Sequence, residues 1–90
     1  EVEEEGSQQS EKKGRFSQAI EGLVEEFRLT PREADVLRQL AMGYGADAAA
    51  EHIGVSWNTV RTHTRNIYVK LDVHSRQELM DLVDARVQER

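Results

Sequence analysis

The chain has 90 residues, of which 38% are hydrophobic, and it carries a net charge of −5 with no cysteine. This length allows one small domain with a modest core. The lack of cysteine excludes a disulfide framework and thiolate metal sites, and no apolar run is long enough to span a membrane. Since the sequence begins with Glu rather than Met, we expect it to be part of a longer protein.

The first segment, residues 1–15, is polar and acidic and has little to bury, so we expect a disordered linker. Residues 16–28 differ, because their apolar side chains recur at helical spacing. These side chains are Phe16, Ile20, Leu23, Val24 and Phe27. The pattern predicts an amphipathic lead helix. It acts either as a strut packed on the domain or as a connector that carries a signal or pairs with a second copy.

Four more helices are predicted within a single domain, residues 29–90, at about 31–42, 46–53, 57–71 and 76–88. Capping signals fix where three of them start. Thr30 and Glu33 form one capping box with Pro31 at the first helical position, Ser56 caps the third helix, and Ser75 and Glu78 form a second box. Gly43 and Gly54 end the helices before them. The expected fold is all-α, a four-helix helix-turn-helix domain preceded by the lead helix.

The helix at about 57–71 has two different faces. Val60, Thr64, Ile67 and Leu71 share one apolar stripe. The opposite face carries Asn58, Arg61, Thr62 and Arg65, with no carboxylate before Asp72. Although the whole chain is acidic, residues 56–76 contain four Arg or Lys against one Asp. A helix that lies against phosphates and base edges has this character, so we expect binding to double-stranded DNA.

A set of residues spread over the last four predicted helices and their connections forms a specific pattern. They are Leu29-Thr30-Pro31-Arg32-Glu33, Val36-Leu37, Gly43, Ala50-Glu51, Gly54-Val55-Ser56, Thr59-Val60, His63, Ile67-Tyr68, Lys70-Leu71, Val73 and Ser75-Arg76. Together they resemble the LuxR-type effector domain of bacterial transcription regulators. The resemblance covers residues 29–83. It implies a four-helix domain that binds specific DNA sequences, with the third helix in the major groove and the fourth pairing two copies on a two-fold site.

The expected DNA-binding residues lie on the third helix and just after its end. Arg61 and Arg65 are expected to contact bases. Thr62 is expected to offer a hydroxyl or a methyl group to a base edge, and Thr59 and Lys70 are expected to contact phosphates. The full set is Asn58, Thr59, Arg61, Thr62, Arg65, Lys70, His74 and Arg76. Met80 and Val87, on a flank of the last helix with little to cover them, are the expected dimerisation residues.

The resemblance also implies partners and a location. We expect a homodimer on DNA, an upstream sensor region in the full-length protein, and RNA polymerase as a further partner. Residues 58–83 are most similar to effector domains that follow multi-pass membrane sensors. The implied location is the cytoplasm, either free or tethered to the inner face of the membrane.

Five positions depart from the family pattern. Gly45 stands where Ser or Thr usually caps, Asp47 where Lys often meets phosphate, His52 where Arg is common, and Val69 where a basic residue is common. Trp57 is unusual at the start of a recognition helix. The first four departures remove favourable charge or capping, which predicts weak binding by an isolated copy.

The sequence gives little support to other classes of function. No catalytic constellation and no phosphate-binding loop is visible, so we expect neither an enzyme nor a cofactor. His52, His63 and His74 fall on different elements, so we expect no metal site, and His63 is expected to pack toward the buried side. The alternative function is a helical dimerisation or partner-binding module with little DNA affinity, which the acidic charge and Asp47 favour. A sigma-factor helix-turn-helix is a nearer alternative, but Thr62-His63 and Asn66-Ile67-Tyr68 fit the LuxR type better.

Overall fold

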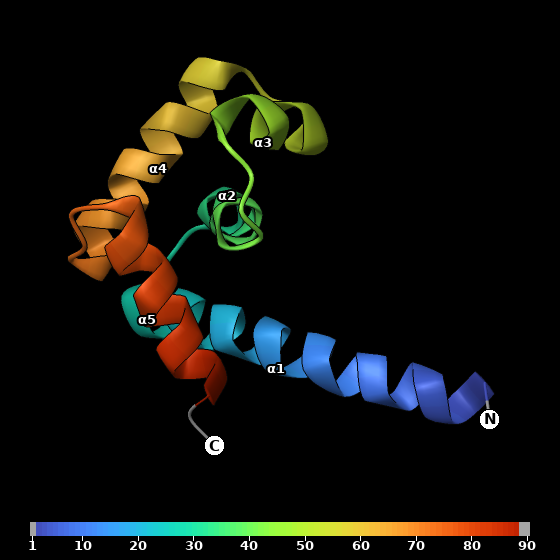
Figure 1. Ribbon diagram of the computed structural model, residues 1–90. Coiled ribbons are helices and arrows are strands. Elements are labelled where there is room, and N and C mark those ends of the chain that lie inside the picture. Colours follow the sequence, from blue (N-terminus) through green and yellow to red (C-terminus); the bar gives the residue numbers. More distant parts are fainter. Residues whose placement is uncertain (1, 89–90) are drawn as a thin grey trace.

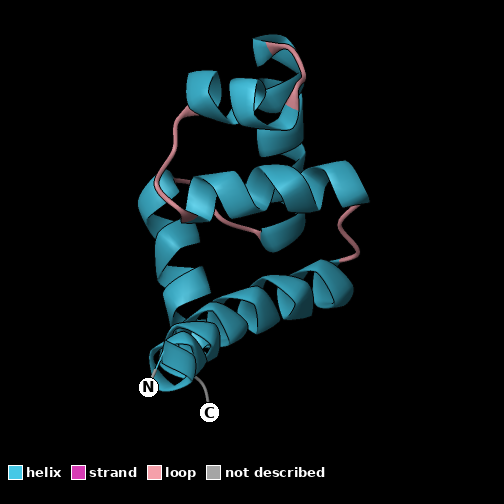
Figure 2. Ribbon diagram, turned by 90° about the vertical axis from the view of Figure 1, so that its right-hand side faces the viewer, coloured by secondary structure: helices cyan, strands magenta, loops and turns pink. Residues whose placement is uncertain are grey.

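The computed structural model describes the backbone of residues 2–88 and the side chains of residues 14–88. Glu1 and the last two residues of the predicted 29–90 domain lie outside the described range. Residues 2–88 form five helices joined by short loops and contain no strand (Figures 1 and 2). They are α1 Val2–Phe27, α2 Pro31–Ala41, α3 Ala46–Ile53, α4 Trp57–Leu71 and α5 Arg76–Gln88. The all-α fold is confirmed, and the bounds predicted for the last four helices agree within one residue.

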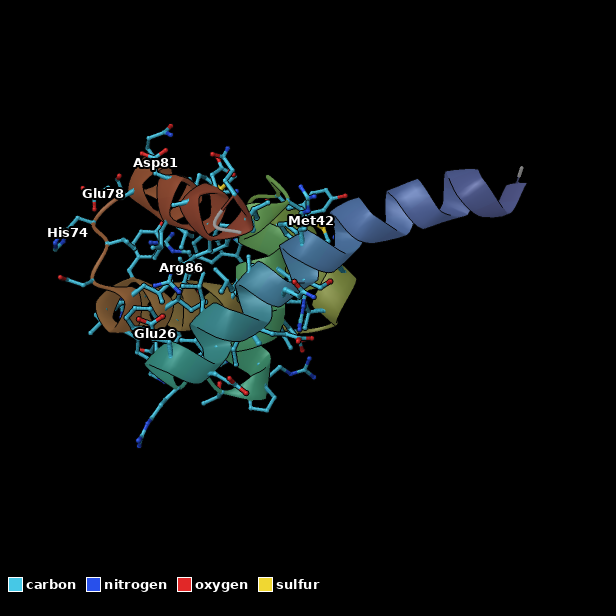
Figure 3. The ribbon with its side chains drawn as sticks, turned by 90° about the horizontal axis from the view of Figure 1, so that it is seen from below. Glu26, Met42, His74, Glu78, Asp81 and Arg86 are labelled. Carbon is cyan, nitrogen blue, oxygen red and sulfur yellow. The ribbon has the colours of Figure 1, made fainter. Side chains whose placement is uncertain are left out.

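The first helix is longer than predicted. The backbone is helical from Val2, whereas we expected a disordered linker up to residue 15 and a helix only from residue 16. The amino-terminal part of α1 extends away from the other helices (Figures 1 and 3). Glu, Gln and Lys dominate this segment, and all three favour helix even without an apolar face to bury. The second half of α1 is part of the domain, because Ile20 and Leu23 are fully buried in the core. This packing matches the strut interpretation of the lead helix.

The central helix of the core is α2, which packs against each of the other four helices. Its Val36, Leu37 and Leu40 side chains are buried. They meet Val60, Ile67 and Leu71 of α4 and Leu79 and Val83 of α5 within one hydrophobic cluster. Burial of apolar side chains on this scale contributes roughly 1.5–3 kcal/mol per residue and is the main stabilisation of so small a domain.

The start of α2 is fixed by a complete capping box, as predicted. The hydroxyl of Thr30 accepts a bond from the Glu33 amide at 3.1 Å, and the Glu33 carboxylate accepts one from the Thr30 amide at 3.0 Å. Pro31 occupies the first turn, where a missing N–H costs nothing. Gly43, with φ of 97°, follows the end of the helix in a conformation that other residues rarely adopt.

The turn between α3 and α4 sets the angle of the helix-turn-helix. Gly54 ends α3 in the left-handed conformation, with φ of 82°. Two residues later the Ser56 hydroxyl accepts a bond from the Thr59 amide at 3.1 Å and caps α4. The small Ala49 and Ala50 side chains are buried beside α4, so the two helices approach closely. Residues 46–71 therefore form the predicted helix, tight turn and helix.

The start of α5 differs in one detail from the predicted capping box. The Ser75 hydroxyl accepts a bond from the Glu78 amide at 3.1 Å, as expected. The Glu78 carboxylate, however, accepts its bond from the His74 amide at 2.7 Å and not from that of Ser75. This bond ties the loop before α5 to its first turn (Figure 3).

The last helix packs along α1, and one predicted feature of it needs correction. Arg86 of α5 donates to Glu26 of α1 at 2.7 Å, and the two side chains lie between these helices in Figure 3. Val87 is partly buried and packs against the core cluster, so it has more cover than we expected. The sequence pattern missed this because it did not show which helix would pack along α5. Met80 is partly buried as well.

Candidate nucleic-acid interface

The outward face of α4 is an open surface of donors without a negative charge. The helix buries Val60, Ile67 and Leu71 against the core. Its exposed residues are Trp57, Asn58, Arg61, Thr62, Arg65, Asn66 and Val69. No carboxylate occurs in α4, and the next one along the chain is Asp72 at its C-cap. The structure therefore brings Asn58, Arg61, Thr62 and Arg65 together on one face, as the periodicity predicted.

The two arginines on this face have no carboxylate partner among residues 14–88, unlike most other cations there. Arg32 and Arg38 both pair with Asp35, at 3.3 and 3.5 Å, and Arg86 pairs with Glu26. No ion pair joins Arg61 or Arg65 to a described acidic residue. Their N–H groups are thus available to an external acceptor. Arg offers a planar fork of donors, which suits phosphate oxygens and the edge of guanine.

Arg61 instead lies over an aromatic ring. Its guanidinium carbon is 4.9 Å from the centre of the Trp57 ring, one helical turn earlier. Trp57 as a whole residue is 45% exposed, so this contact lies at the surface. The sequence singled out Trp57 as unusual without assigning it a role, and the one-turn spacing of an aromatic and an arginine was the signal available.

Thr59 and Asn58 lie in the first turn of α4. The Thr59 hydroxyl is 2.9 Å from the Ser56 hydroxyl, and the Thr59 amide donates to the same atom. Thr59 is therefore part of the cap, although a hydroxyl can accept and donate at once. Asn58 is exposed beside it. The amino terminus of α4 adds the partial positive charge of the helix dipole, which favours anions at this end.

Lys70, expected to contact phosphate, is engaged inside the protein. Its Nζ donates to Glu33 Oε1 at 2.8 Å and to the Arg28 carbonyl at 3.2 Å. Burial acts to raise the pKa of the Glu33 carboxyl, but bonds from Lys70 and the Thr30 amide, and the charges of Lys70 and His63, hold that pKa below its ordinary value. Since an ammonium group has three N–H bonds, Lys70 retains one for an external acceptor.

The Arg76 side chain is hydrogen-bonded within the protein, whereas the His74 side chain is exposed to solvent. Arg76 donates from one terminal nitrogen to the Leu40 carbonyl at 3.0 Å and to the Tyr44 carbonyl at 2.7 Å, so it holds the end of α2. The His74 side chain is 80% exposed, with Nε2 3.8 Å from Asp72. A groove of about 550 Å³ runs beside α4, and its lining includes Arg61, Arg65, Tyr68 and His74. His74 thus lines the same groove as the two arginines. Arg76 instead stabilises the fold through its bonds to the two carbonyls.

The three histidines do not come together. His52 Nδ1 is hydrogen-bonded to Gln39 Oε1 at 2.6 Å. The His52 and Tyr44 rings form a T-shaped contact, with their centres 4.7 Å apart. His63 faces inward as expected, and its Nδ1 is buried with no hydrogen-bond partner among the described residues. Within residues 14–88 no group of three acidic or histidine side chains could hold a metal ion. Across the described helices, none has an apolar stretch of the length that crossing a membrane requires.

A family model described as "Bacterial regulatory proteins, luxR family" matches residues 28–83, which include α2, α3, α4 and most of α5. The chain belongs to this family. The matched range agrees with residues 29–83, over which the sequence resembles LuxR-type domains. The helix-turn-helix of this chain, residues 46–71, lies inside the matched range, and α4 is its second helix.

Similar full-length proteins include HTH-type transcriptional regulators named MalT from Yersinia pestis, Yersinia pseudotuberculosis and Serratia proteamaculans. Each is 43% identical over 56 residues, which are 62% of this chain. The chain spans only about 6% of the length of these relatives. No solved structure matches the chain significantly.

Proposed function

We propose that this luxR-family domain binds specific DNA sequences with α4 in the major groove, as the effector domain of a bacterial transcription regulator. The observation that carries the proposal is the pair Arg61 and Arg65. Both are exposed on a helix without carboxylates, and neither has an acidic partner among the described residues. Unpaired guanidinium groups on a helix of about 10–12 Å diameter match the width and the acceptors of the major groove.

Each predicted residue has a role in this proposal. Arg61 and Arg65 read base edges, and Thr62 and Asn58 contact bases or the sugar-phosphate backbone beside them. Thr59 presents its hydroxyl and the amino terminus of α4 to a phosphate, and His74 contacts the backbone at the other end of the groove. Lys70 adds one donor to a phosphate while it holds Glu33. Arg76 has an indirect role, because it donates to two carbonyls at the end of α2 and so stabilises the fold that presents α4.

The rest of the regulator is proposed by similarity. Relatives of which the matched segment makes up only 6% bear the name of a transcriptional regulator. We propose that this domain follows a sensor region, either soluble or multi-pass membrane, acts on the cytoplasmic side, and binds DNA as a homodimer. RNA polymerase is the proposed partner once the domain is on DNA.

A fluorescence-anisotropy titration tests the function. The 90-residue chain is titrated into labelled random duplexes, and into a site selected from them, at two salt concentrations. We expect binding that weakens with salt, because each neutralised phosphate releases counterions, and tighter binding to the selected site. The absence of binding at low salt would refute the proposal and favour a protein-binding module.

A further inference from the structure

The first two turns of α4 carry an aromatic ring and a cation in contact at the surface. Trp57 and Arg61 are four residues apart, and the guanidinium carbon lies 4.9 Å from the ring centre. Trp57 is 45% exposed, although a tryptophan gains most by burial in a core. Burial in the core therefore does not account for an indole at this position.

The backbone that carries this pair is held in place. Ser56 caps the helix through the Thr59 amide, and Val60, between the two residues of the pair, is fully buried in the core. The indole therefore projects from a fixed point. A long arginine side chain is otherwise free to adopt many rotamers, and fixing one of them on binding costs entropy.

We propose that Trp57 is a positioning residue for base recognition, whose indole face holds the Arg61 guanidinium ready for the edge of a base. This inference rests on the proposed function. The contact places the cation over the face of the indole and involves no carboxylate, so the N–H groups of Arg61 have no acidic partner among the described residues and remain available to a guanine. A carboxylate would hold the same side chain by occupying those donors. The contact with Trp57 thus orders Arg61 while its donors stay available.

Docking on DNA should strengthen the contact. A cation over an aromatic ring is held weakly in water and more tightly when the pair loses its solvent. DNA in contact with the exposed face of α4 would remove that solvent from Trp57 and Arg61 together. The pair would then contribute more to the bound state than to the free protein, which is the condition for an effect on affinity.

The test separates positioning from a direct contact between Trp57 and DNA. Trp57→Leu removes the aromatic face and keeps an apolar side chain, whereas Trp57→Phe retains a ring. Both are made in the 90-residue chain, with and without Arg61→Ala. The probes are a duplex selected from a random library by the unaltered chain and its single base-pair variants.

We expect Trp57→Leu to weaken binding to the selected duplex by roughly five- to thirty-fold, the range of one surface to one desolvated cation–π contact. Discrimination should fall at the same base pair that Arg61→Ala affects. Trp57→Phe should recover most of both losses. The slope of log affinity against log salt should not change, because no phosphate contact is removed. In the Arg61→Ala background, Trp57→Leu should have no further effect.

A second readout needs no DNA, because Trp57 is the only tryptophan of the chain. Arg61→Ala should change the fluorescence of Trp57 in the free protein, whereas Arg15→Ala, on α1, should not. Unchanged fluorescence in Arg61→Ala would overturn the contact, even if Trp57→Leu failed to fold. An equal loss from Trp57→Leu with and without Arg61 would assign Trp57 to direct DNA contact and overturn positioning. Full binding by Trp57→Leu would overturn this inference alone, whereas no binding by the unaltered chain would refute the proposed function as well.

Discussion

Lys70 and Glu33 join the last turn of α4 to the first turn of α2, with Nζ and Oε1 2.8 Å apart. The Glu33 side chain is only 5% exposed and that of Lys70 is 33% exposed. The same carboxylate oxygen also accepts the Thr30 amide in the capping box. One buried carboxylate therefore fixes both a helix start and the end of the proposed recognition helix.

The first prediction concerns Glu33→Gln. The amide keeps an acceptor for Thr30 but loses the charge that faces Lys70, so we expect the free energy of unfolding to fall by about 1–3 kcal/mol at neutral pH. Urea denaturation measures this change. Glu21→Gln, an exposed position on α1, is the control and should have little effect.

The loss should also depend on pH. Because the folded-state pKa of Glu33 lies below its ordinary value of about 4.5, the ionised carboxylate stabilises the fold above that value. This contribution disappears as the pH falls through the lowered pKa of the folded state. The unaltered chain and Glu33→Gln should thus converge in stability in acid. A difference between them that stayed constant down to the lowest pH at which both fold would contradict this assignment.

A second prediction uses the uncapped start of α3. Gly45 is the N-cap in an extended conformation, no side chain caps the helix there, and nothing lies within 4 Å of a Cβ added at this position. Gly45→Ser should therefore raise the stability by about 0.5–1 kcal/mol, since Ser caps slightly better than Gly and the unfolded chain loses freedom. Thermal unfolding measures it. Gly54→Ser is the contrasting variant and should destabilise, because its φ of 82° strains any side chain.

The caps and the faces of the helices could be predicted from sequence because both depend on local spacing. Thr30 with Glu33, and Ser56 with Thr59, interact within one turn, so their positions in the sequence determined the contacts. The roles of Lys70 and Arg76 could not be predicted in this way. Their partners, Glu33 and the carbonyls of Leu40 and Tyr44, are more than thirty residues away in sequence.

The cover over α5 could not be predicted for the same reason. Glu26 and Arg86 are 60 residues apart, and only the packed structure places α1 beside α5. The amphipathic pattern of α1 showed which of its faces is buried but not which helix it buries against. Local patterns therefore predicted which face of α4 is exposed, but they could not predict which helix packs along α5.

The third prediction concerns the arginines of α4. Arg65→Ala should weaken binding to a selected duplex by about 1–3 kcal/mol and relax the preference at one base position. Anisotropy with single base-pair variants of that duplex measures both effects. Arg15→Ala removes the same charge from α1, which lies at the opposite end of the molecule from the α3–α4 turn, and is the control (Figure 1). Equal effects of the two substitutions would indicate a non-specific charge effect and refute base contact by Arg65.

The fourth prediction concerns oligomeric state. The exposed side of α5 is polar and carries Asp81 and Asp84, and Val87 is partly buried against the core, so we expect the free chain to sediment as a monomer. Two copies should bind a palindromic duplex whose half-sites lie about 34–36 Å apart. Analytical ultracentrifugation with and without that duplex measures both. A single copy on the palindrome at saturating concentration would exclude pairing.

The last prediction concerns Asp47, which is exposed in the first turn of α3. A carboxylate there is stabilised by the helix dipole, and all the more because Gly45 leaves this helix end without a side-chain cap. In the proposed complex the same charge faces phosphates. Repulsion is felt within a Debye length of about 10 Å at 0.1 M salt, and we expect Asp47 to lie within that range of the DNA.

Asp47→Lys should therefore tighten binding to all duplexes alike. It should also steepen the fall of log affinity with log salt by up to about 0.9, the value for one added phosphate contact. The stability of the free domain should fall by about 0.3–1 kcal/mol, since a cation now meets the positive end of the dipole. Asp84→Lys, on the exposed side of α5, makes the same change of charge as a control. If both substitutions changed the salt slope equally, or neither changed it, Asp47 would lie away from the DNA and the docking of α3 beside the groove would be wrong.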